Sequence, residues 1–380
     1  MKITVMQENL QKGLGHVARA VAGKTSLPVL GNILLATDQG QLKLAATNLE
    51  IGITNWVDCQ VEEEGAVTVP ARLLTDFVGN LPNDMVKLEL DRRTLALHVR
   101  AARSKATIKG IDAEDFPAIP TVEGEPTAVI AADLFREMIA QVVFAAAADE
   151  SRPVLAGVHL KFEGDQLTLS AADGFRMAVR QGALSQPVKE DLAIIVPARA
   201  MNELSRAIGD QQEAVELTVT RNRSQLLCRV GGLEFLSRLI DGNFPDWRQI
   251  VPSGYETRSV LQREQFLGAA RLASYFARDN NDVIKLTVKP GEGEYATGCV
   301  TISANAAEVG DNTSDLDAAV EGPEGQIAFN VRYVSDVLSA LKTPQVALEM
   351  QGPQNAGVIR PVGAGDDYTH VIMPMHLASY

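Results

Sequence analysis

Two glycine-containing motifs near the N-terminus have the residue types of a phosphate-binding loop. Residues 13–18 match the dinucleotide pattern G-x-G-x-x-A, and residues 23–25 end like a nucleotide-binding loop, with Gly-Lys-Thr. The first motif falls inside a predicted amphipathic helix, where backbone amides are already hydrogen-bonded. The second follows that helix and does not open one, so no helix N-terminus faces a phosphate. A polymerase-associated or phosphate-handling enzyme therefore stays open only as the alternative function.

Carboxylates, histidines and cysteines give no catalytic or metal-binding pattern. Asp173 precedes Gly174, a pair typical of a turn, and no nucleophile or second acid recurs beside it. The five histidines show no metal-ligand spacing. The three cysteines are odd in number and far apart, which argues against a disulfide framework and a zinc site. We expect no metal, no cofactor and no catalysis.

Composition and length place the chain among soluble proteins of several domains. It has 380 residues, of which 46% are hydrophobic and 22% charged, which predicts two to four globular domains. No apolar stretch approaches the ~20 residues that span a bilayer, and the N-terminus lacks the long apolar segment of a signal peptide. These features predict a cytoplasmic protein with no membrane partner. The net charge of −13, taken alone, argues against binding nucleic acid.

Four kinds of segment recur along the chain at one domain-sized period. In the clearest, Arg72, Arg199 and Arg332 occupy matching positions, 127 and 133 residues apart. The others are a strand pattern, an apolar helical stripe and a Phe-Pro pair (residues 42–46, 167–171 and 300–304; 10, 134 and 266; 116–117 and 244–245). A period this long predicts three copies of one domain.

Each copy has the same predicted elements. The spacing of Leu10, Leu14, Val17 and Val21 puts them on one face of a helix. Alternating strands follow, and a second helix over residues 71–80 ends before a proline. Two short helices and about eight strands per copy predict α+β domains with antiparallel sheets. We place the three domains at residues 1–122, 123–253 and 254–380.

Charge is divided unevenly between predicted elements. The six predicted helical segments carry twelve cations and seven anions, a net +5, while the rest of the chain carries −18. A basic helical surface on an acidic body suits a polyanion, although solvated helices are the alternative. Residues 92–109 hold six cations and no anion, and residues 290–331 hold eight anions and no cation. Such complementary surfaces favour head-to-tail association into a ring, unless they are two unrelated solvated faces.

Several longer stretches resemble one family, the bacterial beta sliding clamps, which are the processivity subunits of DNA polymerase III. The resemblance covers essentially the whole chain and is most specific at residues 1–5, 27–32, 172–177, 240–246 and 371–375. It implies three clamp domains and a homodimeric ring that encircles double-stranded DNA without sequence preference, with helices lining the hole. It implies a non-catalytic subunit that tethers its partners. These are the DNA polymerase III catalytic subunit, a clamp loader and other proteins with clamp-binding peptides. A repeat scaffold that binds only proteins is a further alternative.

The resemblance also implies functional residues. The DNA-contacting cations would be Lys24 and Arg152, to which helix placement adds Arg72, Arg136, Arg199 and Arg206. The partner-peptide cleft would comprise Leu155, Ala172, Gly174, Phe175, Arg176, Met177, Pro245, Ile250, Asn330, Tyr333, Val371, Met373, Pro374 and Met375. For the last three residues, a final core strand is the alternative. Independently of the resemblance, we expect the dimer interface to include Arg103, Lys105, Ile108, Leu272 and Glu308.

The chain departs from the family pattern at some of these positions. Ala172 replaces a frequent Thr and Phe175 a frequent His, and Gln249 and His376 stand where Arg is common. These changes bear on which peptide the cleft prefers.

Overall fold

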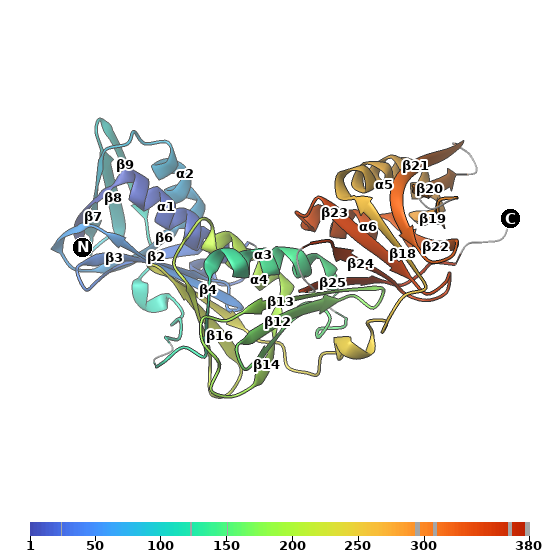
Figure 1. The fold of residues 1–380 in the computed structure, drawn as a ribbon. Helices are drawn as coiled ribbons and strands as arrows, with labels where there is room; N and C mark the ends of the chain where they lie inside the picture. Colours follow the sequence, from blue (N-terminus) through green and yellow to red (C-terminus); the bar gives the residue numbers. More distant parts are fainter. Residues whose placement is uncertain are drawn as a thin grey trace. The chain divides into compact units, whose positions relative to one another are not determined.

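The computed structural model describes residues 1–23, 25–121, 124–149, 151–292, 297–306, 310–363 and 367–376. The chain folds into two compact units (Figure 1). The first comprises Met1–Asp133, Leu184–Lys189 and Glu203–Leu239; the second comprises Leu134–Ala183, Glu190–Asn202 and Ile240–Tyr380. No helix in the described ranges is long and apolar enough to cross a membrane.

The first unit contains two antiparallel sheets. The five-stranded sheet has the order β5-β1-β7-β8-β9 (Gln60–Glu63, Lys2–Met6, Met85–Asp91, Ala96–Ala101 and Ser104–Lys109). The eight-stranded sheet has the order β10-β15-β16-β17-β4-β3-β2-β6 (Ala128–Ile130, Val215–Val219, Gln225–Val230, Leu233–Arg238, Ile51–Asp58, Gln41–Thr47, Asn32–Asp38 and Ala66–Pro70). Strands β5 and β9 are the two outer strands of the five-stranded sheet.

Helix α1 (Gln7–Val17) packs against β3 and β4 and against α2 (Ala71–Gly79). Its predicted stripe of Leu10, Leu14 and Val17 is fully buried. The helix is shorter than predicted, because a 3₁₀ turn follows and Val21 is already extended. Gly13 lies so close to the sheet that a Cβ atom would stand 2.7 Å from Val57 Cγ2. The G-x-G-x-x-A motif is therefore a helix-packing feature.

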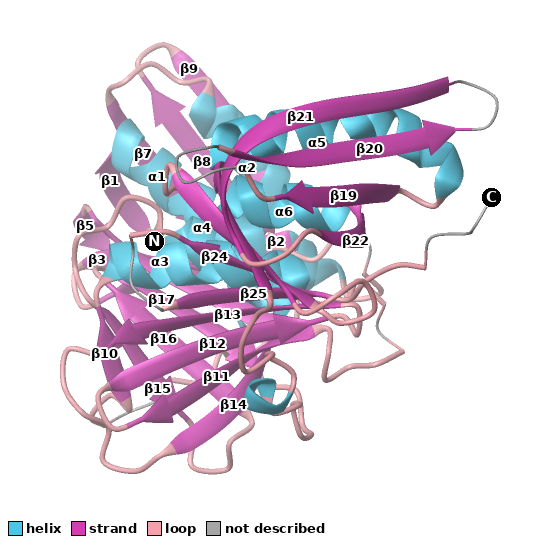
Figure 2. Ribbon diagram, turned by 45° about the vertical axis from the view of Figure 1, so that its right-hand side comes forward, coloured by secondary structure: helices cyan, strands magenta, loops and turns pink. Residues whose placement is uncertain are grey.

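The second unit is built on one antiparallel sheet of twelve strands. Its order is β14-β11-β12-β13-β25-β24-β23-β18-β21-β20-β19-β22 (Leu192–Pro197, Gly157–Glu163, Gln166–Ala172, Arg176–Ala183, Tyr368–Ile372, Gly357–Pro361, Gln345–Met350, Thr257–Gln262, Gly310–Glu321, Gly298–Ala306, Val283–Lys289 and Gly325–Asn330). Strands β20 and β21 form a long pair (Figure 2). Helices α5 (Arg263–Ala277) and α6 (Val331–Ala340) contact each other, and α5 covers β20 and β21.

Two further helices, α3 (Ala132–Val142) and α4 (Ala198–Ile208), match predicted helical segments within a few residues. The expected domain boundaries do not coincide with the ends of the sheets. Strand β17, from the expected second domain, pairs with β4 of the expected first domain. Strand β25, from the expected third, pairs with β13 of the second. Main-chain hydrogen bonding thus continues across both expected joints, and the boundaries at 122/123 and 253/254 remain predictions.

Candidate protein-binding site

An apolar cluster lies on one face of the second unit's sheet. Its buried members are Ala172, Met177, Val179, Val358 and Val371. Strand register explains the grouping, because Met177 and Val358 both lie directly opposite Val371 on neighbouring strands. The side chains of directly paired residues share a face of the sheet. Partly buried apolar residues from three loops pack against this cluster: Leu155, Phe244, Trp247, Val251 and Ala356.

Three large apolar side chains that are close in sequence to residues of this cluster are exposed to solvent. Phe175 is 58% exposed, Ile250 38% and Met373 46%. The backbone N–H of Met373 donates to Phe175 O at 2.8 Å, which ties the C-terminal segment to the turn before β13. We call the buried cluster together with these three residues the apolar site. Large apolar side chains exposed near a buried apolar cluster mark a surface suited to binding another protein.

The turn that presents Phe175 is held by Asp173. Its Oδ1 accepts hydrogen bonds from the backbone N–H groups of Phe175 and Arg176, at 2.9 and 3.0 Å. Gly174 between them has φ +95°, a conformation that side chains rarely adopt. The predicted turn is therefore present, and it fixes the direction of Phe175.

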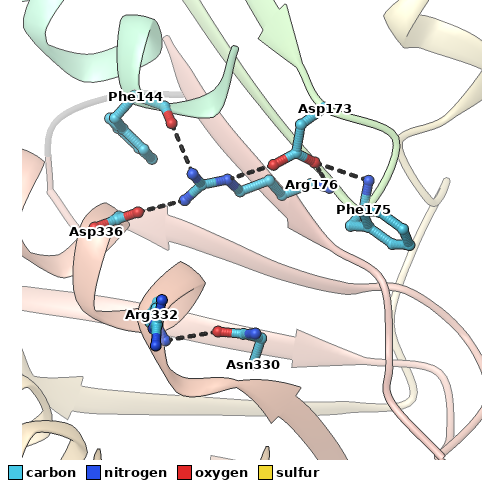
Figure 3. Close-up of polar contacts among 7 residues, drawn as sticks. All are labelled: Phe144, Asp173, Phe175, Arg176, Asn330, Arg332 and Asp336. Atoms are coloured by element: carbon cyan, nitrogen blue, oxygen red, sulfur yellow. Dashed lines mark hydrogen bonds and ion pairs between the residues drawn. The ribbon is translucent and has the colours of Figure 1, made fainter. Parts of the chain in front are cut away.

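Arg176 lies at the centre of a partly buried polar network (Figure 3). Its Nε donates to Asp173 Oδ2 at 3.0 Å, Nη1 to Asp336 Oδ2 at 2.5 Å and Nη2 to the carbonyl of Phe144 at 2.7 Å. The guanidinium also stands 4.4 Å from the ring centre of Tyr333. Phe175 points away from the guanidinium in the same view. Arg176 therefore joins the turn before β13 to helix α6.

The surroundings of this network are buried enough to shift several pKa values. Burial, with a smaller effect of Asp173, raises the pKa of Tyr333. Burial, and then the neighbouring Arg176 cation, lowers the pKa of His370 to about 3. His370 is therefore neutral at pH 7.

On α6, Asn330 caps the helix by accepting a hydrogen bond from the Arg332 N–H at 2.9 Å.

The structure brings most of the predicted cleft residues into or next to the apolar site. Ala172, Met177 and Val371 belong to the buried cluster, and Leu155 packs against it. Gly174 and Arg176 lie in the adjoining turn and network with Tyr333, while Asn330 caps the helix that carries Tyr333. Pro245 and Ile250 belong to the loop whose Phe244 and Trp247 pack on the cluster. Pro374 and Met375 follow Met373 outside β25, and the N–H of Met375 donates to Ala328 O at 2.8 Å.

Sequence reasoning missed Phe144, Asp336, Trp247 and Val358. The strand alternation around Val358 was a usable signal for that residue. Asp336 could not be found in this way, because it meets Arg176 across 160 positions of sequence.

The predicted DNA-contacting cations have local acidic neighbours in several cases. Arg72 lies 3.6 Å from Asp76, and Arg206 lies 2.9 Å from Glu203. Arg152 and Arg199 are exposed, and Arg136 is half-buried. Lys24 lies outside the described residues.

The predicted dimer-interface residues are placed differently from one another. Arg103 and Lys105 are exposed at the start of the outer strand β9, and Leu272 is 54% exposed on α5. Ile108 is only 3% exposed, so within its own chain it contributes to the core and offers little surface. Glu308 lies outside the described residues.

Comparisons with known proteins match nearly the whole chain. Three models of the DNA polymerase III beta subunit match consecutive parts of the chain: the N-terminal domain at residues 1–120, the central domain at 129–246 and the C-terminal domain at 248–376. The chain belongs to the DNA polymerase III beta subunit family. The resemblance seen in the sequence and the predicted three-domain α+β fold are thereby confirmed. This is the family of the sliding clamps, non-catalytic subunits that tether DNA polymerase.

Individual relatives are similar over their whole length. A beta sliding clamp of Synechococcus elongatus is 32% identical, and one of Synechocystis sp. is 31% identical, with 100% of both chains covered in each case. The crystal structure of a DNA polymerase sliding clamp from Bacillus subtilis is 28% identical, with a TM-score of 0.92 and 100% of both chains covered. A DNA polymerase III subunit beta from Pseudomonas aeruginosa is 30% identical, with a TM-score of 0.89, covering 99% of this chain and 100% of that one.

Proposed function

We propose that two copies of this chain close head to tail into a ring around duplex DNA. The ring holds DNA polymerase III and other replication proteins on the DNA in the cytoplasm. The observation that carries this proposal is the match of all three clamp-domain models in order along one chain. A ring is retained by topology, so it needs no tight contact with phosphate.

The charge distribution supports sliding over tight binding. The helical segments carry a net +5 within a chain of −13. Arg72 and Arg206 are each accompanied by a carboxylate on the same helix. Each phosphate that a protein neutralises adds about one unit to the salt dependence of binding. A few partly neutralised cations on helices that line the hole therefore give weak, mobile contact with DNA. Further candidates for such contact are Lys24, Arg136, Arg152 and Arg199.

Strand edges of opposite charge support the head-to-tail contact. Strand β9 is one of the two outer strands of its sheet and carries Lys105 and Lys109. Strand β21 pairs with β18 only at its end, over residues 319–321. Its remaining length carries the exposed Asp311, Asp315 and Asp317. Strand edges without a neighbour in their own sheet are ready to pair with another chain, and opposite charge selects which one.

The apolar site is the surface for partner proteins. We propose that it takes a short apolar-aromatic peptide segment of DNA polymerase III, of the clamp loader or of other clamp-binding proteins. Met177 and Met373 suit such a role, because methionine repacks around different partners.

Retention on circular DNA tests the proposed ring. The chain is loaded onto a nicked circular plasmid by the clamp loader of the same organism and ATP, and is then separated by gel filtration at high salt. We expect it to remain with the plasmid, and to be released once a restriction enzyme cuts the plasmid at one site. Salt weakens phosphate contacts but not a topological link. Equal retention on circular and linear DNA would contradict the ring.

A further inference from the structure

Arg176 is committed to acceptors within its own chain. Its side chain is only 10% exposed, and its Nε, Nη1 and Nη2 atoms each donate to a different group. Two of these acceptors are carboxylates, and the ring of Tyr333 lies against the guanidinium. A cation satisfied in this way gains little from an incoming acidic group, because the exchange would break existing charged hydrogen bonds.

Of the three groups that accept hydrogen bonds from the Arg176 side chain, Asp336 lies farthest away along the chain. It projects from α6 and its Oδ2 accepts from Arg176 Nη1. Asp173 accepts from Arg176 Nε with one oxygen, and with the other it holds the N–H groups of Phe175 and Arg176. The side chain that is most exposed in the apolar site is thus linked to α6 through a chain of hydrogen bonds: Asp336, Arg176, Asp173 and the turn.

We propose that Asp336 is a positioning residue for the apolar site. It fixes the guanidinium of Arg176, which in turn fixes the Asp173 carboxylate and the turn that presents Phe175. Arg176 is then a structural link between β13 and α6 and not the cation that binds the partner peptide. The inference rests on the proposed peptide-binding function and deepens it, because it places part of the control of binding on α6, outside the apolar surface.

Peptide binding by Asp336→Asn separates this role from a direct role of Arg176. The probes are two fluorescein-labelled peptides, Gly-Leu-Ala-Leu-Phe and Gly-Leu-Glu-Leu-Phe, measured by fluorescence anisotropy with the full chain. Positioning predicts that both peptides bind about tenfold more weakly to the variant, within the range of couplings measured for hydrogen-bonded networks. A direct role predicts the opposite for the glutamate peptide, because Asp336→Asn frees positive charge on Arg176.

Matched variants make the result specific. Asp336→Glu keeps the carboxylate and is expected to restore most of the affinity. Asp282→Asn also removes one negative charge from an ion pair with α6, because Asp282 Oδ2 lies 2.9 Å from Nη2 of Arg332 on that helix. This variant is expected to leave peptide binding unchanged. In a double-mutant cycle, Arg176→Met with Asp336→Asn should bind no more weakly than Arg176→Met alone, because Asp336 acts through Arg176.

The outcomes are distinguishable. If the wild-type chain binds the peptides and Asp336→Asn leaves the affinity unchanged or raises it, the positioning role of Asp336 is overturned and the proposed peptide-binding function is not. Additive losses in the double-mutant cycle would overturn the positioning role as well. Failure of the wild-type chain to bind either peptide would overturn the proposed peptide-binding function, and the inference with it.

Discussion

At the scale of single residues, His370 is a titratable group buried without a matching partner. It lies in β25, and its ring centre is 5.5 Å from that of Phe144. Neither ring nitrogen has a hydrogen-bond partner among the described residues. Burial and then Arg176 hold the pKa of His370 at about 3, against an ordinary value of 6.5. The folded chain therefore keeps this histidine neutral under conditions where the unfolded chain protonates it.

This difference predicts acid sensitivity that one substitution relieves. Below pH 6.5 the unfolded chain binds a proton that the folded chain refuses until about pH 3, so stability falls through that interval. The lowered pKa of His370 alone reduces the free energy of unfolding by about 2 kcal/mol at pH 5 relative to pH 7. His159, whose pKa burial lowers to about 4, acts in the same direction. His370→Leu should flatten the pH dependence of the free energy of unfolding, measured by urea denaturation from pH 7.5 to 5.

The exposed His376 supplies the control, and His376→Leu should leave the slope unchanged. An unaltered slope in His370→Leu would show that the acid sensitivity originates elsewhere.

At the scale of elements, two glycines of α1 face different surroundings. A Cβ at Gly13 would lie 2.7 Å from Val57 Cγ2 and 2.9 Å from Leu44 Cδ1, whereas nothing lies within 4 Å of one at Gly15. Gly13→Ala should destabilise the chain by about 1–3 kcal/mol, because the helix must move off its sheet. Gly15→Ala should stabilise it by up to about 1 kcal/mol through helix propensity. Thermal unfolding of the two variants gives the comparison, and equal effects would contradict the packing role of Gly13.

The elements themselves were largely predictable from the sequence, and their reasons are local. The spacing of apolar residues correctly predicted the buried face of α1. Helix α2 ends before Pro82, as expected. Strand β5 was not predicted, since its residues Gln60–Glu63 are mainly polar and lie at a sheet edge. The continuation of sheets across the expected domain boundaries was also missed, because strand pairing between distant segments leaves no periodic signal in either of them.

The candidate site was predictable where it depends on short segments and not where it depends on long-range charge pairing. The turn at Asp173 and Gly174 and the exposed Phe175 lie within a few residues of each other. The partnership of Arg176 with Asp336 depends on how α6 meets β13, and neither segment alone contains it. For the same reason, the structural role of Arg176 could not be separated from a direct role in the sequence.

At the scale of the whole molecule, opposite charge on β9 and β21 predicts how two chains join. Reversing Arg103 and Lys105 together (Arg103→Glu with Lys105→Glu) should raise the dimer dissociation constant by at least about tenfold at low salt. The mass in sedimentation equilibrium should fall toward the 40.8 kDa of one chain. The effect should shrink at high salt, because the screening length falls from about 10 Å at 0.1 M to about 3 Å at 1 M.

Compensating substitutions give this prediction its sharpest form. Combining the reversed cations with Asp315→Lys and Asp317→Lys in the same chain restores opposite charge between the two strand edges, so the mass of two chains should return. Lys87→Glu changes an exposed cation on an inner strand of the β9 sheet and should leave the dimer intact. If the reversed chain stays dimeric while Lys87→Glu dissociates, the contact must use another face of this sheet. Because each chain carries both a basic strand edge and an acidic one, the predicted contact uses different surfaces of the two chains, and two such contacts close a ring.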